Sequence, residues 1–234
     1  MAETFLTPQV VTALVGVGGV VVGAAITAAV QWTLSSKRIE ADEKLAERKF
    51  EFDKQLAERK FELDARIADR KRKQDLAEEV LVGFYEARDL MKAVRSPFAR
   101  ESEGKTRPRS QDEDAGSANS RDAYYAIIER FEARKEVVAN LMSKRFRVVT
   151  WFGGDAIKPF DLLQEAITSV IIAAKSLVRN YGTTRISQTV SEKNEETIWG
   201  CESDDSDHVL IKIEKSISEI ERICRPALED KILM

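Results

Sequence analysis

The sequence has very few residues of the kinds that bind metals or attack substrates. Its 234 residues include one histidine, His208, and two cysteines, Cys201 and Cys224. A di-iron centre in a helical bundle needs two Glu-x-x-His pairs, and a structural zinc site needs four ligands, mostly cysteine and histidine, so the composition argues against both. Two cysteines are too few for a disulfide framework, and we interpret them as free thiols in a reducing compartment.

Catalytic and nucleotide-binding motifs are also missing. The chain has no Walker A loop, no GxGxxG turn and no GxSxG elbow. The acidic run ahead of His208 lacks the glycine and the final glutamate of a calcium-binding loop, so we interpret it as a helix cap and solvated turn. A net charge of −3 gives no overall basic field, which argues against nucleic acid as a partner. We therefore expect a protein that is not an enzyme and needs no cofactor or metal ion.

Charge is absent from a whole segment near the N-terminus. No ionisable side chain lies between Glu3 and Lys37, and the 21 residues from Val10 to Val30 are all Val, Ala, Gly, Leu, Ile or Thr. At ~1.5 Å per residue, a helix of this length spans about 31 Å, the thickness of a hydrocarbon core. We predict a single transmembrane helix at about residues 10–32, within an N-terminal segment 1–36.

The charges on either side of this helix set its predicted orientation. The leader contains no Lys or Arg, which argues against a cleaved signal peptide, whereas Lys37 and Arg38 follow the helix directly. The positive-inside rule then places the N-terminus outside and everything after Lys37 in the cytoplasm, with the chain in the inner (cell) membrane. The lipid bilayer is therefore a predicted partner.

Small residues follow one face of the predicted span. Gly19, Gly23 and Thr27 are spaced by four residues, so they lie on the same side of a helix. Small residues at this spacing let two membrane helices approach closely, and we predict that this face packs against a second copy. The alternative is that the glycines are incidental, since glycine is common in membrane helices.

An eleven-residue repeat follows the span. Leu45–Asp53 returns as Leu56–Asp64 with one difference, and a fainter copy lies on each side. Neither glycine nor proline interrupts the sequence from Ala24 to Val82, and both residues disfavour the interior of a helix. We therefore predict a charged helical stalk at residues 37–74 that is continuous with the membrane helix.

The repeat produces two apolar stripes on the stalk. Because eleven residues make three turns at about 3.67 residues per turn, equivalent positions stay on one side of a straight or slightly right-handed helix. We predict that the first stripe mediates self-association in a parallel oligomer; the alternatives are packing against another part of the same chain, or a solvated helix held by ion pairs. The first, the leucine stripe, consists of Leu45, Phe52, Leu56, Leu63 and Ile67, and the second, the alanine-phenylalanine stripe, of Ala46, Phe50, Ala57, Phe61 and Ala68.

In architecture, residues 10–73 resemble the peripheral-stalk b subunit of ATP synthases. That subunit likewise joins an N-terminal membrane helix to a long charged stalk with an eleven-residue pattern. The resemblance is limited to this part of the chain, because a further large domain follows Lys73.

That further domain, residues 75–234, has the apolar spacing of helices packed in a bundle. Polar stretches at about 97–120 and 182–206 predict mobile connecting loops. The predicted fold is therefore all-α, with a transmembrane helix, a continuous stalk and a C-terminal four-helix bundle-like domain. The predicted bundle helices are at about 75–95, 122–149, 156–180 and from 207 to a bend or stop at Pro226.

These features together favour a membrane-tethered scaffold or interaction protein without enzymatic activity, whose bundle binds an unknown cytoplasmic protein. The alternative is a membrane effector or sensor, for example in bacterial stress or phage defence, whose helical domain controls assembly of the membrane helix. We expect a homo-oligomer held through the stalk and the membrane helix.

Overall fold

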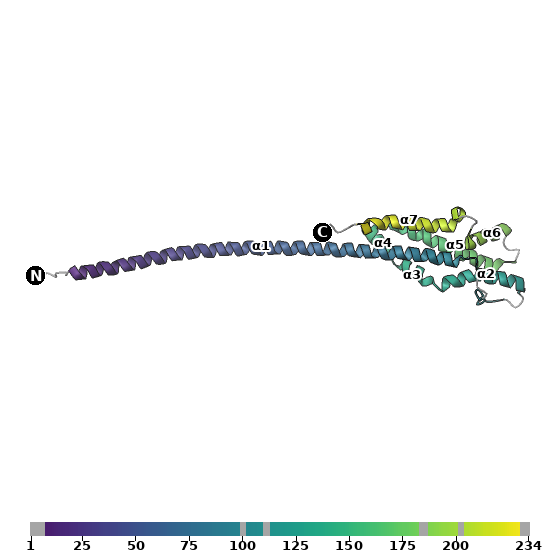
Figure 1. Ribbon diagram of the computed structural model, residues 1–234, viewed down its shortest axis with the longest axis horizontal. Helices are drawn as coiled ribbons and strands as arrows, with labels where there is room; N and C mark the ends of the chain where they lie inside the picture. Colours follow the sequence, from purple (N-terminus) through teal and green to yellow (C-terminus); the bar gives the residue numbers. More distant parts are fainter. Residues whose placement is uncertain (1–7, 99–101, 110–112, 183–186, 201–203, 230–234) are drawn as a thin grey trace. The chain divides into compact units, whose positions relative to one another are not determined.

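All regular structure in the described part of the chain is helical, which confirms the all-α prediction (Figure 1). The computed structural model describes residues 8–98, 102–109, 113–182, 187–200 and 204–229; among residues 8–21, position 19 alone is described beyond its backbone. The elements are α1 (Pro8–Val94), α2 (Ala115–Glu132), α3 (Lys135–Ser143), α4 (Arg145–Phe152), η1 (Gly154–Ile157), α5 (Lys158–Asn180), α6 (Gln188–Trp199), η2 (Asp204–Ser206) and α7 (His208–Glu229).

One continuous helix, α1, covers the predicted span, the stalk and the first helix of the predicted bundle. Since neither glycine nor proline occurs from Ala24 to Val82, every residue in that stretch can take part in the helical hydrogen bonds. Within the described residues, no helix is long and apolar enough to cross a membrane. About half of the predicted membrane segment Val10–Val30 consists of residues whose side chains are outside the description, and the segment stays a prediction.

The chain divides into two compact units, Met1–Ile67 and Ala68–Met234. The second unit therefore begins before the predicted boundary at residue 75. Lys73 accounts for part of this difference, because its ammonium nitrogen lies 5.0 Å from the centre of the Phe152 ring at the end of α4. Leu76 is the first residue of α1 whose described side chain is buried.

The core of the second unit forms around α5, which packs against α2, α6 and α7. Helix α5 is apolar at steps of three and four residues, and that face is buried. Phe84 of α1 meets Phe160 of α5 edge-on, with ring centroids 5.0 Å apart, and neither ring is exposed. Ile127 of α2 and Ile220 of α7 belong to the same buried cluster.

The predicted helix 122–149 consists of three shorter helices, α2, α3 and α4. Helix α2 begins earlier than predicted because Asp114 caps it: a carboxylate oxygen of Asp114 accepts the backbone N–H of Ser117 at 3.0 Å. The chain breaks at Arg134, whose backbone leaves the helical region (φ −134°, ψ 17°), and turns again between α3 and α4. Neither glycine nor proline marks these breaks, so the local sequence gives no signal for them.

The C-terminal part also differs from the prediction in two places. Helix α6 lies within the predicted loop 182–206, where the hydroxyl oxygen of Ser187 caps it by accepting the N–H of Val190 at 3.4 Å. Helix α7 passes through Pro226 and ends at Glu229, so the helix is not stopped at the proline. Proline removes only one helical N–H, and here it lies in the last turn of the helix.

The predicted loop 97–120 is anchored by polar contacts where it is described. Arg107 is buried, and its guanidinium contacts the carboxylates of Asp122 at 3.0 Å and Glu113 at 2.8 Å. The backbone N–H of Gly104 donates to a carboxylate oxygen of Glu129 at 2.6 Å. Residues 102–109 are therefore held against α2 by specific contacts rather than forming a free connection.

Candidate functional site

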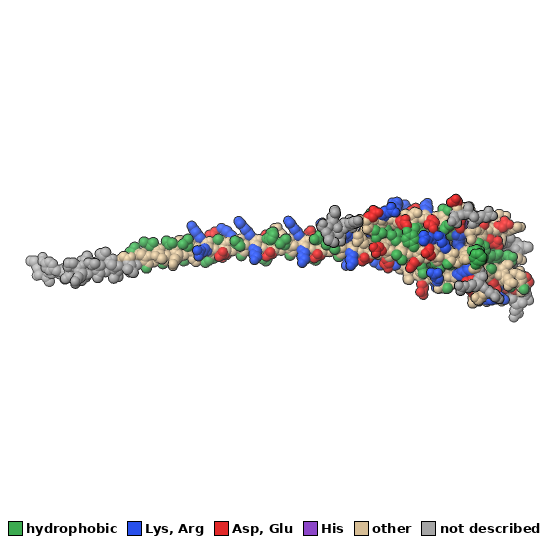
Figure 2. Space-filling view, in the orientation of Figure 1, with side chains coloured by type: hydrophobic (Ala, Val, Ile, Leu, Met, Phe, Trp, Pro, Cys, Tyr) green, Lys and Arg blue, Asp and Glu red, His purple; other side chains and the backbone are tan. Residues whose placement is uncertain are grey.

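The leucine stripe is exposed along the first unit. Its five side chains are between 45% and 67% exposed, with Ile67 the least exposed and Leu45 the most. The described residues of that unit belong to a single helix, so they offer no second element to cover the stripe. Figure 2 shows hydrophobic side chains recurring between charged ones along this helix. A contiguous exposed apolar surface of this kind is typical of an interaction site.

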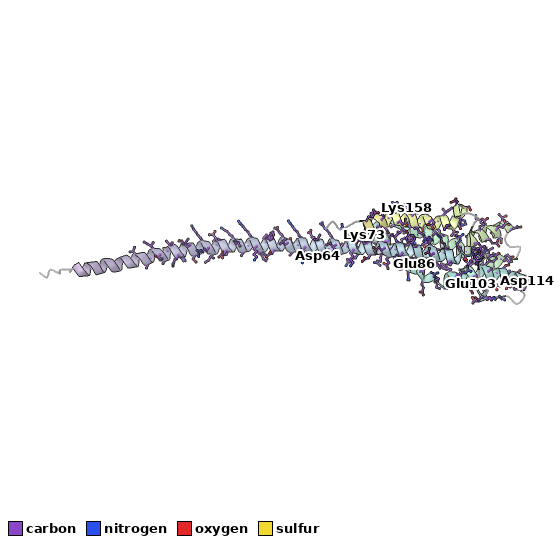
Figure 3. The ribbon with its side chains drawn as sticks, in the orientation of Figure 1. Asp64, Lys73, Glu86, Glu103, Asp114 and Lys158 are labelled. Carbon is purple, nitrogen blue, oxygen red and sulfur yellow. The ribbon has the colours of Figure 1, made fainter. Side chains whose placement is uncertain are left out.

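Side chains project from the stalk along its length (Figure 3), and the charged ones lie between the apolar ones (Figure 2). The ammonium of Lys44 pairs with Glu40 at 2.6 Å, and Arg66 lies 4.0 Å from Glu62. Each pair joins residues four positions apart on an exposed helix, where ion pairs contribute little to stability. These contacts support the helix, but they do not explain why an apolar stripe should recur in every repeat.

The predicted packing face of the membrane segment is open in the single chain. A β-carbon placed on Gly19 or Gly23 would meet no atom within 4 Å. Thr27 donates its hydroxyl to the carbonyl oxygen of Gly23 at 2.9 Å, which satisfies the hydroxyl within the helix. The face is thus free to approach another helix, and its role in self-association stays a prediction.

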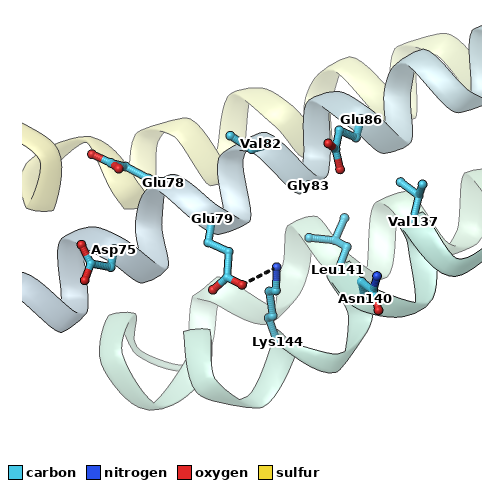
Figure 4. A pocket seen from close by; sticks show the side chains of 10 residues that line it. All are labelled: Asp75, Glu78, Glu79, Val82, Gly83, Glu86, Val137, Asn140, Leu141 and Lys144. Atoms are coloured by element: carbon cyan, nitrogen blue, oxygen red, sulfur yellow. Dashed lines mark ion pairs between the residues drawn. The ribbon is translucent and has the colours of Figure 1, made fainter.

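A second candidate surface lies in the second unit between α1 and α3, and we call it the acidic groove (Figure 4). It is a cavity of about 480 Å³ whose lining includes the carboxylates of Asp75, Glu78, Glu79 and Glu86. Gly83 lets the two helices approach, since a β-carbon at this position would lie only 3.0 Å from a methyl carbon of α3.

The acidic groove suits a cationic partner. All four of its carboxylates come from α1, and the ammonium of Lys144 pairs with one of them, Glu79, at 2.8 Å. The remaining negative charge favours a basic segment over an anionic ligand. The described part of the chain contains no cluster of three or more His, Cys, Asp or Glu that could hold a metal ion.

The acidic groove was not predicted from the sequence. The sequence does contain one indication of the groove. Asp75, Glu79 and Glu86 are spaced by four and seven residues, which places them on one side of a helix. That signal identifies an acidic face, but the groove also needs α3 beside it, and this depends on the break at Arg134.

Two further groups with reactive chemistry, Cys224 and Asp207, are engaged in the fold, whereas His208 is exposed. Cys224 is buried, and burial raises the pKa of its thiol to about 11, so the thiol is protonated and unreactive at neutral pH. Cys201 lies outside the described residues. One carboxylate oxygen of Asp207 accepts two backbone N–H groups in the first turn of α7 at 3.0 Å, and the other pairs with buried Arg95 at 2.8 Å. Asp207 therefore caps the helix, as predicted, but it is buried against Arg95 and does not lie in a solvated turn.

Two surfaces therefore stand out as candidates for function: the leucine stripe of the first unit and the acidic groove of the second. The stripe depends on α1 alone, whereas the groove depends on two helices. No protein-family model, curated protein or solved structure matches this chain. Its function is inferred from the chemistry of these two surfaces.

Proposed function

We propose that this chain is a membrane-tethered helical interaction protein without enzymatic activity. The segment Val10–Val30 anchors it in the inner membrane with the N-terminus outside. The stalk joins copies of the chain through the leucine stripe, and the C-terminal domain binds a protein partner in the cytoplasm. The observation on which the proposal rests is the exposed leucine stripe, which recurs with the eleven-residue repeat.

Burial of the leucine stripe contributes free energy of the size that self-association requires. Complete burial of a Leu or Phe side chain contributes about 1.5–3 kcal/mol, and side chains that are already half covered gain about half of this. Five such side chains on one copy, together with the apolar side chains that cover them on the next copy, would contribute on the order of 10 kcal/mol. This is comparable with the cost of bringing two chains together, which is about 4–15 kcal/mol.

The tether is supported by the amino-acid sequence. The run Val10–Val30 contains no charged or strongly polar side chain, and its length matches one hydrocarbon core. Lys37 and Arg38 follow it, which supports a cytoplasmic location for the stalk and the C-terminal domain. Anchoring at one end also favours parallel association, because all copies enter the membrane in the same direction.

The acidic groove supports a role in partner binding for the C-terminal domain. Carboxylates and exposed Val82 line the same cavity, so a segment with basic and apolar side chains would fit both parts of the lining. The pair between Lys144 and Glu79 bridges the two sides of this surface (Figure 4) and would be replaced by the partner's own basic groups.

The proposal is tested by the oligomeric mass of residues 37–234. The double substitution Phe52→Glu with Leu56→Glu puts two carboxylates into the leucine stripe, and burial of unpaired charge at an interface is unfavourable. We expect light scattering to show an oligomer for the unchanged sequence and a monomer for the double variant.

A matched control is Gln55→Glu with Arg66→Glu, which adds two glutamates outside both stripes. This control should keep the oligomeric mass of the unchanged sequence. A monomeric unchanged sequence at high protein concentration would contradict self-association through the stalk.

A further inference from the structure

The two stripes of the stalk differ in the charges that border them. At ~100° per residue, the leucine stripe and the alanine-phenylalanine stripe lie about 130° apart around the helix. Both are exposed: Phe50 and Phe61 of the second stripe are 72% and 77% exposed. The first unit therefore presents two separate apolar faces, and one partner helix cannot cover both.

Basic residues border the leucine stripe on both sides. In three successive copies of the repeat, the third and fourth residues after the leucine are Lys37–Arg38, Arg48–Lys49 and Arg59–Lys60. At ~100° per residue, the first of each pair lies about 60° to one side of the leucine and the second about 40° to the other side. Two identical leucine stripes packed face to face would bring these basic residues together in each repeat, and like charges beside a helical interface oppose pairing.

Acidic residues border the alanine-phenylalanine stripe. Asp42, Asp53 and Asp64 lie at the same position in three copies, about 20–60° from this stripe at ~100° per residue. Glu47 and Glu58 lie on its other side. One further repeat position lies between this stripe and the glutamates, and its charge changes from copy to copy. The charges that recur beside this face are therefore acidic.

We propose that the leucine stripe of one copy packs on the alanine-phenylalanine stripe of the next copy, with parallel stalks in register. The inference rests on the self-association proposed above and names the surface that the leucine stripe contacts. The basic border then faces an acidic border in every repeat, at intervals of about 16 Å along the helix. The alanines of the second stripe leave room for the larger leucines of the first.

This pairing joins unlike faces, so it produces a ring rather than a dimer. Each stalk contacts one neighbour through each stripe, and the angle of about 130° between the stripes is the interior angle of a ring of about seven helices. The eleven-residue period alone would also permit a shift by one repeat. A common anchor in the membrane removes that freedom, because every copy begins at the same depth.

The pairing is tested by disulfide cross-linking of the full chain in membranes. One tagged copy has Leu56→Cys and a second, differently tagged copy has Ala57→Cys; both have Cys201→Ser, and buried Cys224 is left in place. These neighbouring positions belong to different stripes, and a disulfide needs β-carbons about 4 Å apart. We expect a mixed disulfide between the two copies, in excess over disulfides between like copies.

The outcomes separate this inference from the proposed function. A disulfide mainly between two Leu56→Cys copies would overturn the pairing of unlike stripes, while self-association would stand. A monomeric chain without disulfides in any combination would overturn both.

Charge reversal provides a second test on the full chain. A stalk whose four basic residues are reversed has two acidic borders, and a stalk whose four acidic residues are reversed has two basic borders. Neither variant should assemble alone, because every interface would join borders of the same sign. A mixture should regain the assembly as rings with an even number of stalks, because alternation of the two variants then joins opposite signs at every interface. If both variants are helical by circular dichroism and the mixture stays unassembled, the inference is wrong. The first variant is Arg48→Glu, Lys49→Glu, Arg59→Glu and Lys60→Glu; the second is Glu47→Lys, Asp53→Lys, Glu58→Lys and Asp64→Lys.

Discussion

At the scale of single residues, Gly104 has the most restrictive environment in the anchored segment 102–109. Its φ is 77°, and a β-carbon would lie 1.9 Å from the carbonyl oxygen of Asp122. Relief of that clash would pull the backbone N–H away from the carboxylate of Glu129. The close contact of the two backbones requires a residue without a β-carbon.

We expect Gly104→Ala to lower the free energy of unfolding by about 2 kcal/mol or more, because it combines an unfavourable φ with a backbone clash. Urea denaturation followed by circular dichroism measures the change. The control is Gly154→Ala, where a β-carbon would meet no atom within 4 Å. Equal stabilities for the two variants would show that the segment is not anchored as described.

A second prediction at this scale concerns Glu113 and pH. Its carboxylate contacts Arg107 and Arg121, each at 2.8 Å, and the hydrogen bond from Arg107 holds its pKa below the ordinary value of 4.5. As the pH falls, the unfolded chain therefore binds this proton first. The contribution of Glu113 to stability is complete at neutral pH and is lost progressively below pH 4.5.

Glu113→Gln removes this titration and is the variant to compare with the unchanged chain. The difference between their urea midpoints should be largest near pH 7 and should shrink as the pH falls below 4.5. A difference that is constant across this range would mean that the ion pairs of Glu113 do not contribute to stability.

At the scale of elements, the contact between α1 and α5 depends on the pair of Phe84 and Phe160. Both rings are fully buried, so Phe160→Ala leaves a cavity between the two helices. We expect a loss of about 3–5 kcal/mol in the free energy of unfolding. Ile172→Ala on the same helix is the control, since Ile172 is 62% exposed and should cost less than about 1 kcal/mol. Similar losses for both variants would contradict this packing.

The elements that the sequence predicts well are those with strong apolar periodicity. Helix α5 was predicted at 156–180 and extends over Lys158–Asn180, and α7 begins one residue after its predicted start. Helix α6 was missed because it is mainly polar, with only Thr197 and Ile198 buried, so it has no clear apolar face. The break at Arg134 was missed because it is set by packing and not by a helix-breaking residue.

The same distinction applies to the candidate sites. The leucine stripe can be read from the sequence because an eleven-residue repeat on one helix needs no other element. The acidic groove cannot, because it forms only where Leu141 of α3 packs against Gly83 of α1. Anchoring of residues 102–109 was missed for a similar reason: Arg107 is polar and suggests exposure, yet two carboxylates permit its burial.

At the scale of the whole molecule, the central claim is that the chain is tethered to a membrane by Val10–Val30. In the proposed arrangement, the tether would give the stalks a common direction and register, and it would place the acidic groove in the cytoplasm. Three forms of the chain test it: the full chain, a chain without Val10–Val30, and a control without residues 56–66, which removes one repeat of the stalk and leaves the predicted span intact.

The most direct measurement is the distribution of these three forms between membrane pellet and supernatant after an alkaline wash, which removes peripheral proteins. We expect the full chain and the control to stay in the pellet, because about 20 apolar residues in a bilayer withstand such treatment. The chain without Val10–Val30 should be in the supernatant. A full chain that washes into the supernatant would contradict the tether, and a chain without Val10–Val30 that stays in the pellet would show that another part of the molecule holds it there.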